Sequence, residues 1–409
     1  MTADPQRGDQ LGALNIILDG AVLLRDSQIV ETGKSADLRA CFPDEDLLDA
    51  GDRVVMPGFV DAHTHLVWAG SRAAEFEMRL QGSSYMEIMA AGGGIQSTVN
   101  ATRAASSEDL LAQTRLRALD IFRHGTTTAE AKSGYGLDLE NEIKQLAVLL
   151  ELNKKGGLEI LPTFLGAHAI PAEYKDCPDD YVNLLCANML PEVRRWWLEH
   201  AAEYPLPFVD VFCEKGAFNL DQSRRILESA QGLGFPLKIH ADEFENLGGA
   251  ALAAELKAVS ADHLVTTSGR DLLILSQSDT VAVSLPLTPF GLAEKDYSPA
   301  LDIIKAGGLF ALASDLNPGT AWCGNMQLAI AVACRYIRLT PAQAVASATI
   351  NAAAAVGRHQ RLGSVHPGKQ ADLIILSVSD YRHLAYQFGV NLVDMVIKKG
   401  RLFKNSTPC

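Results

Sequence analysis

The chain has 409 residues, of which 48% are hydrophobic and 21% are charged, and its formal net charge is −13. This composition is that of a globular protein with enough apolar residues for a large core. The negative charge argues against nucleic acid or an anionic membrane as the main partner, although one local arginine can still attract a small anionic substrate. No apolar run reaches the ~18 residues of a membrane span, so we expect none.

The polar start of the chain, MTADPQRGDQ, has no apolar core of the kind found in signal peptides. Seven cysteines are scattered along the sequence without a CxxC pair. Isolated cysteines in odd number are typical of reduced thiols, so we predict a cytoplasmic protein.

Both ends of the chain consist of short β-rich runs broken by turn signals. Residues 14–33, LNIILDGAVLLRDSQIVETG, contain Asp-Gly and Asp-Ser turns, and residues 363–378 and 393–405 have the same character. The terminal pieces, 1–55 and 358–409, are too short to be separate domains. We therefore expect them to meet as one small β-sandwich.

Between these pieces, apolar strand-like runs alternate eight times with helical segments. The expected strands are 54–65, 125–134, 158–168, 208–216, 235–243, 258–264, 280–286 and 307–319. Helical segments separate them, and Ser106 or Ser107 is a plausible N-cap while Pro341 suits a first helical turn. This alternation predicts an α/β fold, a (β/α)8 TIM-like barrel over residues 56–357.

Polar side chains follow the expected strands at their carboxyl ends, where barrel enzymes carry their active sites. His63 and His65 end the first strand, and side chains at i and i+2 point the same way. The other strand-end groups are His168, His240, Glu243, His263 and Asp315. A lone histidine at a strand end is more often structural than a ligand, but so many in one barrel predict a single polar centre.

Three imidazoles and a carboxylate suit Zn²⁺ or Fe²⁺. The predicted ligands are His63, His65, His240 and Asp315. Such a metal acidifies a water near neutral pH, and Asp315 can act both as ligand and as the base that takes the proton. A two-metal site would need a bridging carboxylate or carbamylated lysine, for which Lys132 and Glu214 are the nearest candidates. Neither position fits well, so we expect one metal.

Several long stretches resemble the amidohydrolase superfamily over nearly the whole chain. They are PGFVDAHTHLVWAGSRAAEFEMRLQGSSYMEIMAAGGGI, HGTTTAEAKSGYGLDLENE, PTFLGAHAIP, DVFCEKGAF, LKIHADEF and SDLNPGT. Within the superfamily they are similar to the hydrolases that open the ring of 4-imidazolone-5-propanoate in histidine degradation. The resemblance implies that water opens this ring to give N-formimidoyl-L-glutamate.

The resemblance also implies roles for individual residues. Arg72, Tyr135 and His168 would bind the substrate, because a guanidinium matches a propionate and the two rings can hydrogen-bond it. Glu243 would contact a ring nitrogen and could shuttle a proton there, and His263 could donate to the carbonyl oxygen or the attacking water. The product's glutamate-like end would be held by Asn317, Gly319 and Thr320.

Each of these residues also has a structural interpretation. Arg72 could lie on the surface, Tyr135 could pack a loop, His168 could cap a strand, and Glu243 and His263 could support other groups. Asn317 and Gly319 could only shape the turn that Asn-Pro-Gly encodes.

Two other functions remain open at this stage. One is a hydrolase or deaminase of a related small anionic cyclic amide or imine, because residues 265–268, 286–295 and 321–326 depart from the family pattern at the pocket rim. The other is a barrel without catalytic activity, against which the intact metal set argues. Barrels of this type often pair, so a homodimer is a further expectation.

Overall fold

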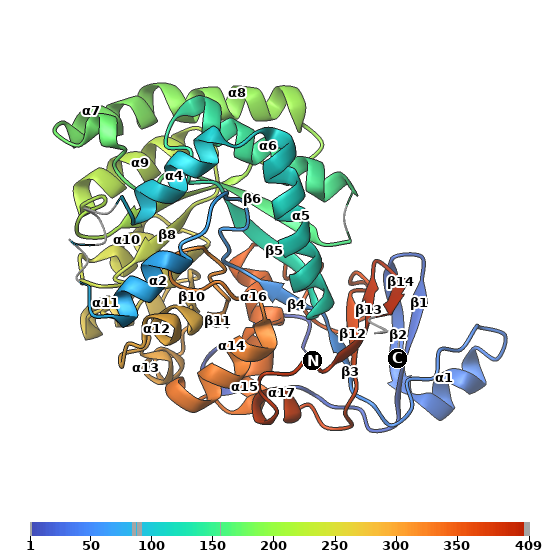
Figure 1. The fold of residues 1–409 in the computed structure, drawn as a ribbon. Coiled ribbons are helices and arrows are strands. Elements are labelled where there is room, and N and C mark those ends of the chain that lie inside the picture. Colours follow the sequence, from blue (N-terminus) through green and yellow to red (C-terminus); the bar gives the residue numbers. More distant parts are fainter. Residues whose placement is uncertain (1, 84–86, 88–91, 156, 405–409) are drawn as a thin grey trace.

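The computed structural model describes residues 2–83, 87, 92–155 and 157–404, and its largest part is a barrel of parallel strands (Figure 1). Eight strands pair in the order of the sequence. They are β4 (Phe59–Asp61), β5 (Thr126–Lys132), β6 (Glu159–Ala167), β7 (Phe208–Cys213), β8 (Lys238–Ala241), β9 (Ser260–His263), β10 (Val281–Ser284) and β11 (Phe310–Leu312). A parallel bridge between Thr64 and Leu316 joins the first strand to the last. The predicted (β/α)8 fold is therefore confirmed.

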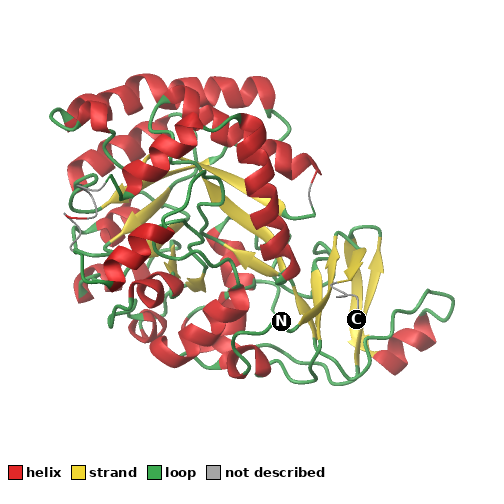
Figure 2. Ribbon diagram, viewed as in Figure 1, coloured by secondary structure: helices red, strands yellow, loops and turns green. Residues whose placement is uncertain are grey.

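Helices surround these strands, as Figure 2 shows in red around yellow. The helices around the barrel are α2 (Ala73–Leu80), α4 (Ile95–Ala104), α5 (Ser107–Arg123), α6 (Leu139–Lys155), α7 (Pro178–Leu184), η3 (Leu185–Met189), α8 (Leu190–His200), α9 (Leu220–Gly232), α10 (Gly249–Glu255), α11 (Gly269–Ser276), α12 (Leu287–Leu292), α13 (Ala300–Lys305), α14 (Met326–Val332), η4 (Ala333–Ile337), α15 (Pro341–Ser347) and α16 (Ile350–Ala355). Ser106 caps α5 by accepting from Asp109 N, and Pro341 opens α15. Within the described residues, no helix combines the length and apolar character needed to cross a bilayer.

A small β unit beside the barrel is built from both ends of the chain. Strands β1 (Gly20–Arg25) and β2 (Gln28–Lys34) form a hairpin, followed by α1 (Ser35–Cys41). The second sheet has the order β14-β13-β12-β3, from β3 (Val55–Pro57), β12 (Leu373–Leu376), β13 (Val393–Lys398) and β14 (Arg401–Lys404). Ile29 of the hairpin packs in one cluster with Leu373, Ile375 and Ile397 of that sheet. The expected unit formed by both termini is confirmed.

The segment expected as one strand over 54–65 is two strands in different sheets. β3 pairs with β12 of the small unit, and β4 pairs with β5 of the barrel. Gly58 lies between them, where its N–H donates to the carbonyl of Asp372 at 3.0 Å and a Cβ would overlap Thr127. Only glycine allows the chain to pass so close to β5. The boundary predicted at residue 55/56 thus falls inside β3, and the domain limits remain predictions.

The predicted C-terminal piece extends past the described residues, because 405–409 lie outside them together with Cys409. The six described cysteines are all free. The small unit packs against α5, where the rings of Phe122 and Phe403 lie 5.3 Å apart.

Candidate metal centre and substrate site

His63 and His65 leave β4 on the side predicted from their spacing. The chain remains extended beyond β4 because it pairs with the segment after β11: Asp315 N donates to His63 O at 3.0 Å, and His65 N donates to Leu316 O at 2.8 Å. Both imidazoles therefore turn toward the barrel axis, with their Nε2 atoms 3.4 Å apart. Strand closure fixes the geometry of the pair.

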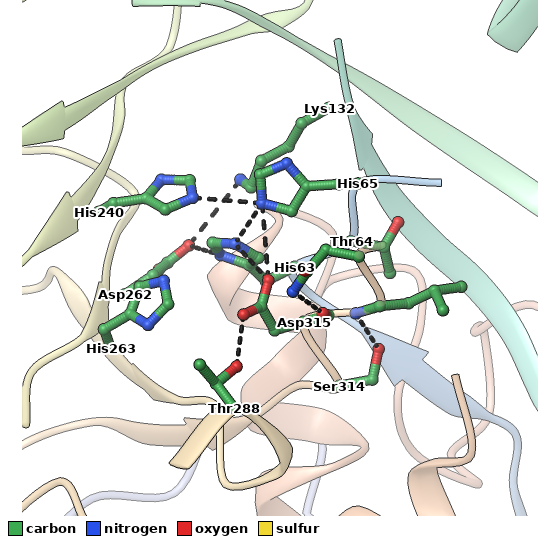
Figure 3. A network of polar contacts seen from close by, with 12 residues as sticks. His63, Thr64, His65, Lys132, His240, Asp262, His263, Thr288, Ser314 and Asp315 are labelled. Carbon is green, nitrogen blue, oxygen red and sulfur yellow. Dashed lines mark hydrogen bonds and ion pairs between the residues drawn. The ribbon is translucent and has the colours of Figure 1, made fainter. Parts of the chain in front are cut away.

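His240 and Asp315 complete the group. His240 Nε2 from β8 lies 3.4 Å from His65 Nε2, and one ligand atom from each histidine lies within 4.8 Å of the others. Asp315 Oδ1 is 3.5 Å from Nε2 of both His63 and His65 (Figure 3). That buried oxygen has no hydrogen-bond partner among the described residues. Three converging imidazole nitrogens and an unpartnered carboxylate oxygen fit a divalent metal ion.

The electrostatics of the site keep the imidazoles of His63 and His65 neutral. Burial lowers the pKa of His63 and of His65 well below the usual value, and nearby Lys132 and other histidines lower it further. Neutral imidazole is the form that binds metals. Burial also raises the pKa of Asp315 to about 6, although Thr288 opposes this shift by donating to Oδ2 at 2.5 Å. Oδ2 of Asp315 is thus hydrogen-bonded to Thr288, whereas Oδ1 faces the histidines.

Asp315 and His263 both adopt a left-handed backbone conformation, with φ of 55° and 77°. Residues other than glycine rarely do so, and such strain persists where surrounding contacts enforce it. For Asp315, one such contact is Asn317, whose Nδ2 donates to its carbonyl at 2.8 Å. The turn after β11 therefore aims the carboxylate into the centre.

Two further carboxylates stand behind the metal ligands. Asp262 Oδ2 accepts from His63 Nδ1 at 2.7 Å, and Asp210 Oδ2 lies 3.0 Å from His240 Nδ1. A carboxylate only accepts, so the hydrogen bond to Asp262 holds the proton of His63 on Nδ1 and leaves Nε2 free for the metal. Nδ1 of His240 and of His65 is buried without a hydrogen-bond partner among the described residues, and the ring of His65 stacks on His168 at 4.8 Å.

Arg72 lies at the N-terminus of α2 and reaches the turn that holds Asp315. A Cβ at Gly319 would overlap Nη1 of this guanidinium. Asn317 Oδ1 accepts from the N–H groups of Gly319 and Thr320, both at 2.8 Å, and Thr320 Oγ1 accepts from Asn317 Nδ2 at 2.9 Å. The structure therefore brings together the guanidinium and the three residues predicted to hold the glutamate-like end.

Tyr135 and His168 form the wall beside His65. Their rings lie 5.2 Å apart, and Tyr135 is 5.9 Å from His65. His168 Nδ1 donates to Gly134 O at 3.0 Å, which leaves Nε2 as an acceptor. Burial lowers the pKa of His168 to about 3, so this ring is neutral.

Glu243 and His263 lie together, with Glu243 Oε1 3.5 Å from His263 Nδ1. Burial raises the pKa of Glu243 well above its usual value, and the charges of Asp315 and Glu214 raise it further. His263 Nε2 is buried and has no partner among the described residues, and its ring is 5.5 Å from that of His63. Glu243 can therefore donate a proton, and His263 keeps a free ring nitrogen.

The candidates for a second, bridging position are engaged elsewhere. Lys132 Nζ donates to Glu130 and Asp210, each at 2.7 Å. Glu214 accepts from the backbone N–H groups of Phe244 and Lys215, both at 2.9 Å. Both side chains are thus held by other groups of the protein.

This architecture, a parallel barrel with imidazoles and a carboxylate at its strand ends, is that of the metal-dependent amidohydrolases. The model of the amidohydrolase family matches residues 227–403. An imidazolonepropionase of Herpetosiphon aurantiacus is 52% identical over 98% of this chain and 94% of its own. One of Chloroflexus aggregans is 46% identical over 97% and 93%. The chain belongs to the imidazolonepropionase family.

Solved structures share the fold at much lower sequence identity. An adenosine deaminase from Xanthomonas campestris with bound zinc is 20% identical, with a TM-score of 0.70 over 96% of this chain and 90% of that one. An amidohydrolase from an environmental sample of the Sargasso Sea is 16% identical, with a TM-score of 0.66 over 94% and 88%. These similarities concern the fold alone.

The sequence did not reveal the buried charged residues beneath the metal ligands, nor the Thr288 hydroxyl that donates to Asp315. Asp210, Asp262 and Lys238 lie within the predicted strands, where charged residues are rarely buried unless paired. That pattern could have marked them as functional. Thr288 carried no comparable signal, because a single threonine just after a predicted strand is common.

Proposed function

We propose that this chain hydrolyses 4-imidazolone-5-propanoate to N-formimidoyl-L-glutamate. The observation that carries this proposal is the guanidinium of Arg72 against Gly319, on the turn that also bears Asp315. A guanidinium so placed can pair with a propionate while the ring lies at the histidines. The name of the relatives, at about half identity over nearly the whole chain, agrees with that substrate.

The reaction breaks the bond between the carbonyl carbon and the adjacent ring nitrogen. That carbon takes the oxygen of water and becomes a carboxylate, while the nitrogen takes a proton. A divalent metal held by His63, His65, His240 and Asp315 would acidify the water and polarise the carbonyl. Because Thr288 donates to Oδ2, Oδ1 of Asp315 would serve both roles proposed for this residue, as metal ligand and as the base that takes the water's proton.

Glu243 and His263 are suited to the other end of the bond. Burial raises the pKa of Glu243 above its usual value, which favours the protonated carboxyl that can donate to a ring nitrogen. His263 has a free Nε2 that can lie near the carbonyl oxygen. Tyr135 and His168 offer a hydroxyl and a neutral ring nitrogen to orient the substrate.

We further propose one zinc ion per chain, with iron as the alternative, because three imidazoles and a carboxylate suit both. A homodimer is also proposed, supported by exposed apolar side chains such as Tyr386 and Phe388. The free state of the described cysteines supports a cytoplasmic location.

The experiment supplies the unstable substrate in place from urocanate with urocanase and follows its ultraviolet loss on the purified chain. Metal is quantified in the same sample, and the product is identified by mass. Rapid loss that yields N-formimidoyl-L-glutamate, and that His240→Ala abolishes, is the expected result. A metal-loaded chain that leaves this substrate intact would refute the proposal.

A further inference from the structure

Five charged side chains, fully buried, lie beneath the metal ligands. Glu130 and Lys132 come from β5, Asp210 from β7, Lys238 from β8 and Asp262 from β9, and each side chain is 0% exposed. Isolated buried charges are strongly unfavourable, and even paired ones often contribute little to stability. Apolar residues would fill the same space well, so stability alone does not explain these five buried charges.

The contacts connect the two lysines to two metal ligands. Lys132 Nζ donates to Asp210 Oδ2 at 2.7 Å, and that same oxygen lies 3.0 Å from His240 Nδ1. Asp210 Oδ1 also accepts from the backbone N–H of His240 at 3.2 Å. One carboxylate therefore bridges a lysine and a predicted metal ligand.

The second connection runs through Asp262. Its Oδ2 accepts from His63 Nδ1 at 2.7 Å and lies 4.0 Å from Lys132 Nζ (Figure 3). The same oxygen lies 3.6 Å from Lys238 Nζ. Lys238 also donates to the carbonyls of Ala62 and Ala355, at 3.1 and 3.2 Å, which fixes its ammonium beneath the barrel centre.

We propose that Lys132 and Lys238 are positioning residues for metal binding, which act by holding the carboxylates of Asp210 and Asp262 in place behind His240 and His63. A carboxylate beside Nδ1 favours the imidazole tautomer that has its proton on Nδ1, whereas a proton on Nε2 would block the metal. The lysines keep the carboxylates there, because each carboxylate lies between an ammonium group on one side and an imidazole Nδ1 on the other. The inference rests on the metal centre of the proposed function and not on its substrate.

The local electrostatics agree with this role. Burial alone would lower the pKa of Lys132, yet Asp210, Glu130 and Asp262 raise it. Lys132 is thus a fixed cation.

The test is a double-mutant cycle on metal affinity, measured with a zinc-binding dye as competitor. Lys132→Met and Asp210→Asn are made singly and together. If the lysine acts through the aspartate, each single change weakens zinc binding roughly 10- to 100-fold, and the double variant is much less impaired than the product of the two. Additive effects, or unchanged affinity in both singles, would overturn the proposal.

A parallel cycle joins Lys238→Met and Asp262→Asn, and the isosteric Asp→Asn variants keep the test valid if a lysine variant does not fold. Lys369→Met is the matched control, because Lys369 is also buried and donates to the carbonyls of Ala3 and Leu362. It is expected to change thermal stability and leave zinc affinity unchanged.

A second readout is the ring ¹⁵N spectrum of the metal-free chain. Nδ1–H signals for His63 and His240 are expected in the wild type, with a shift toward the Nε2–H form in the variants. An unchanged spectrum would contradict the proposal. Neither measurement uses the substrate, so a wild type that binds zinc but leaves 4-imidazolone-5-propanoate intact refutes the proposed function alone.

Discussion

The guanidinium of Arg72 lies so close to Gly319 that a Cβ at residue 319 would overlap Nη1. The two residues belong to opposite ends of the barrel sequence, after β4 and after β11. Gly319 N also donates to Asn317 Oδ1 at 2.8 Å, so the guanidinium rests on a turn that is itself held in shape. This contact sets the distance between the proposed propionate site and the metal centre.

Gly319→Ala is therefore expected to displace the Arg72 guanidinium. We expect KM for 4-imidazolone-5-propanoate to rise roughly 10- to 100-fold, the effect of losing a charge-assisted hydrogen bond, with a smaller change in kcat. Steady-state kinetics check this. Gly269→Ala is the control, since a Cβ there meets nothing within 4 Å. An unchanged KM would show that Arg72 does not bind the propionate.

Glu75→Gln is expected to loosen the same guanidinium. Glu75 Oε2 accepts from Arg72 Nε at 2.9 Å, and Ser97 Oγ donates to Oε1 at 3.1 Å, so the carboxylate is fixed on both sides. A neutral amide accepts more weakly, and we expect KM to rise about tenfold while kcat stays nearly constant. Glu77→Gln, on the exposed side of the same helix, is the control. A fall in kcat at constant KM would contradict this role.

His240→Ala is expected to remove the metal. Two imidazoles and one carboxylate then remain as ligands. The metal content should fall from about one ion per chain to a small fraction, and activity should be lost. Elemental analysis of the purified variant measures this. His200→Ala, at an exposed histidine stacked on Trp196, should keep both metal and activity. Full metal content in His240→Ala would mean that the ligand set is different.

Thr288→Val tests the hydroxyl that donates to Asp315 Oδ2 at 2.5 Å. Valine keeps the shape but not the donor, so the carboxylate is less well oriented. We expect kcat to fall roughly 10- to 100-fold. Thr288→Ser, which retains the hydroxyl, should restore most of the rate. Equal rates in the wild type and the valine variant would show that Asp315 needs no such support.

Glu159 supplies a pH-dependent contribution to stability. Burial alone would raise its pKa, but the hydrogen bond from Arg361 and the charge of Lys398 lower it to about 2 from an ordinary 4.5. Because the folded-state pKa is depressed, the stabilisation is present above pH ~4.5 and is lost as the pH falls toward ~2. It is on the order of 3 kcal/mol.

Glu159→Gln should therefore lower the free energy of unfolding most at neutral pH, and the difference from wild type should shrink below pH ~4.5. Urea unfolding at several pH values measures this. Glu203→Gln, at an exposed position, is the control. A difference that does not depend on pH would mean that the ion pairs contribute nothing through charge.

Much of this molecule could be predicted without coordinates. The alternation of strands and helices predicted the barrel, and the terminal β-rich pieces predicted the small unit. The prediction for 54–65 was wrong in one respect, because Gly58 lets the chain change sheets within what looks like one apolar run. The local pattern of apolar residues predicts which residues are extended, but it does not predict which neighbouring strand they pair with.

The sequence by itself determined which side chains face the barrel centre, because alternation along a strand orients His63 and His65 together and parallel strands end at one edge. Only the tertiary structure decided which atoms meet. Asp262 behind His63, Lys132 beside Asp210 and Arg72 against Gly319 each join segments far apart in the chain. Those contacts depend on the register of neighbouring strands and on barrel closure, and no local run of residues encodes either one.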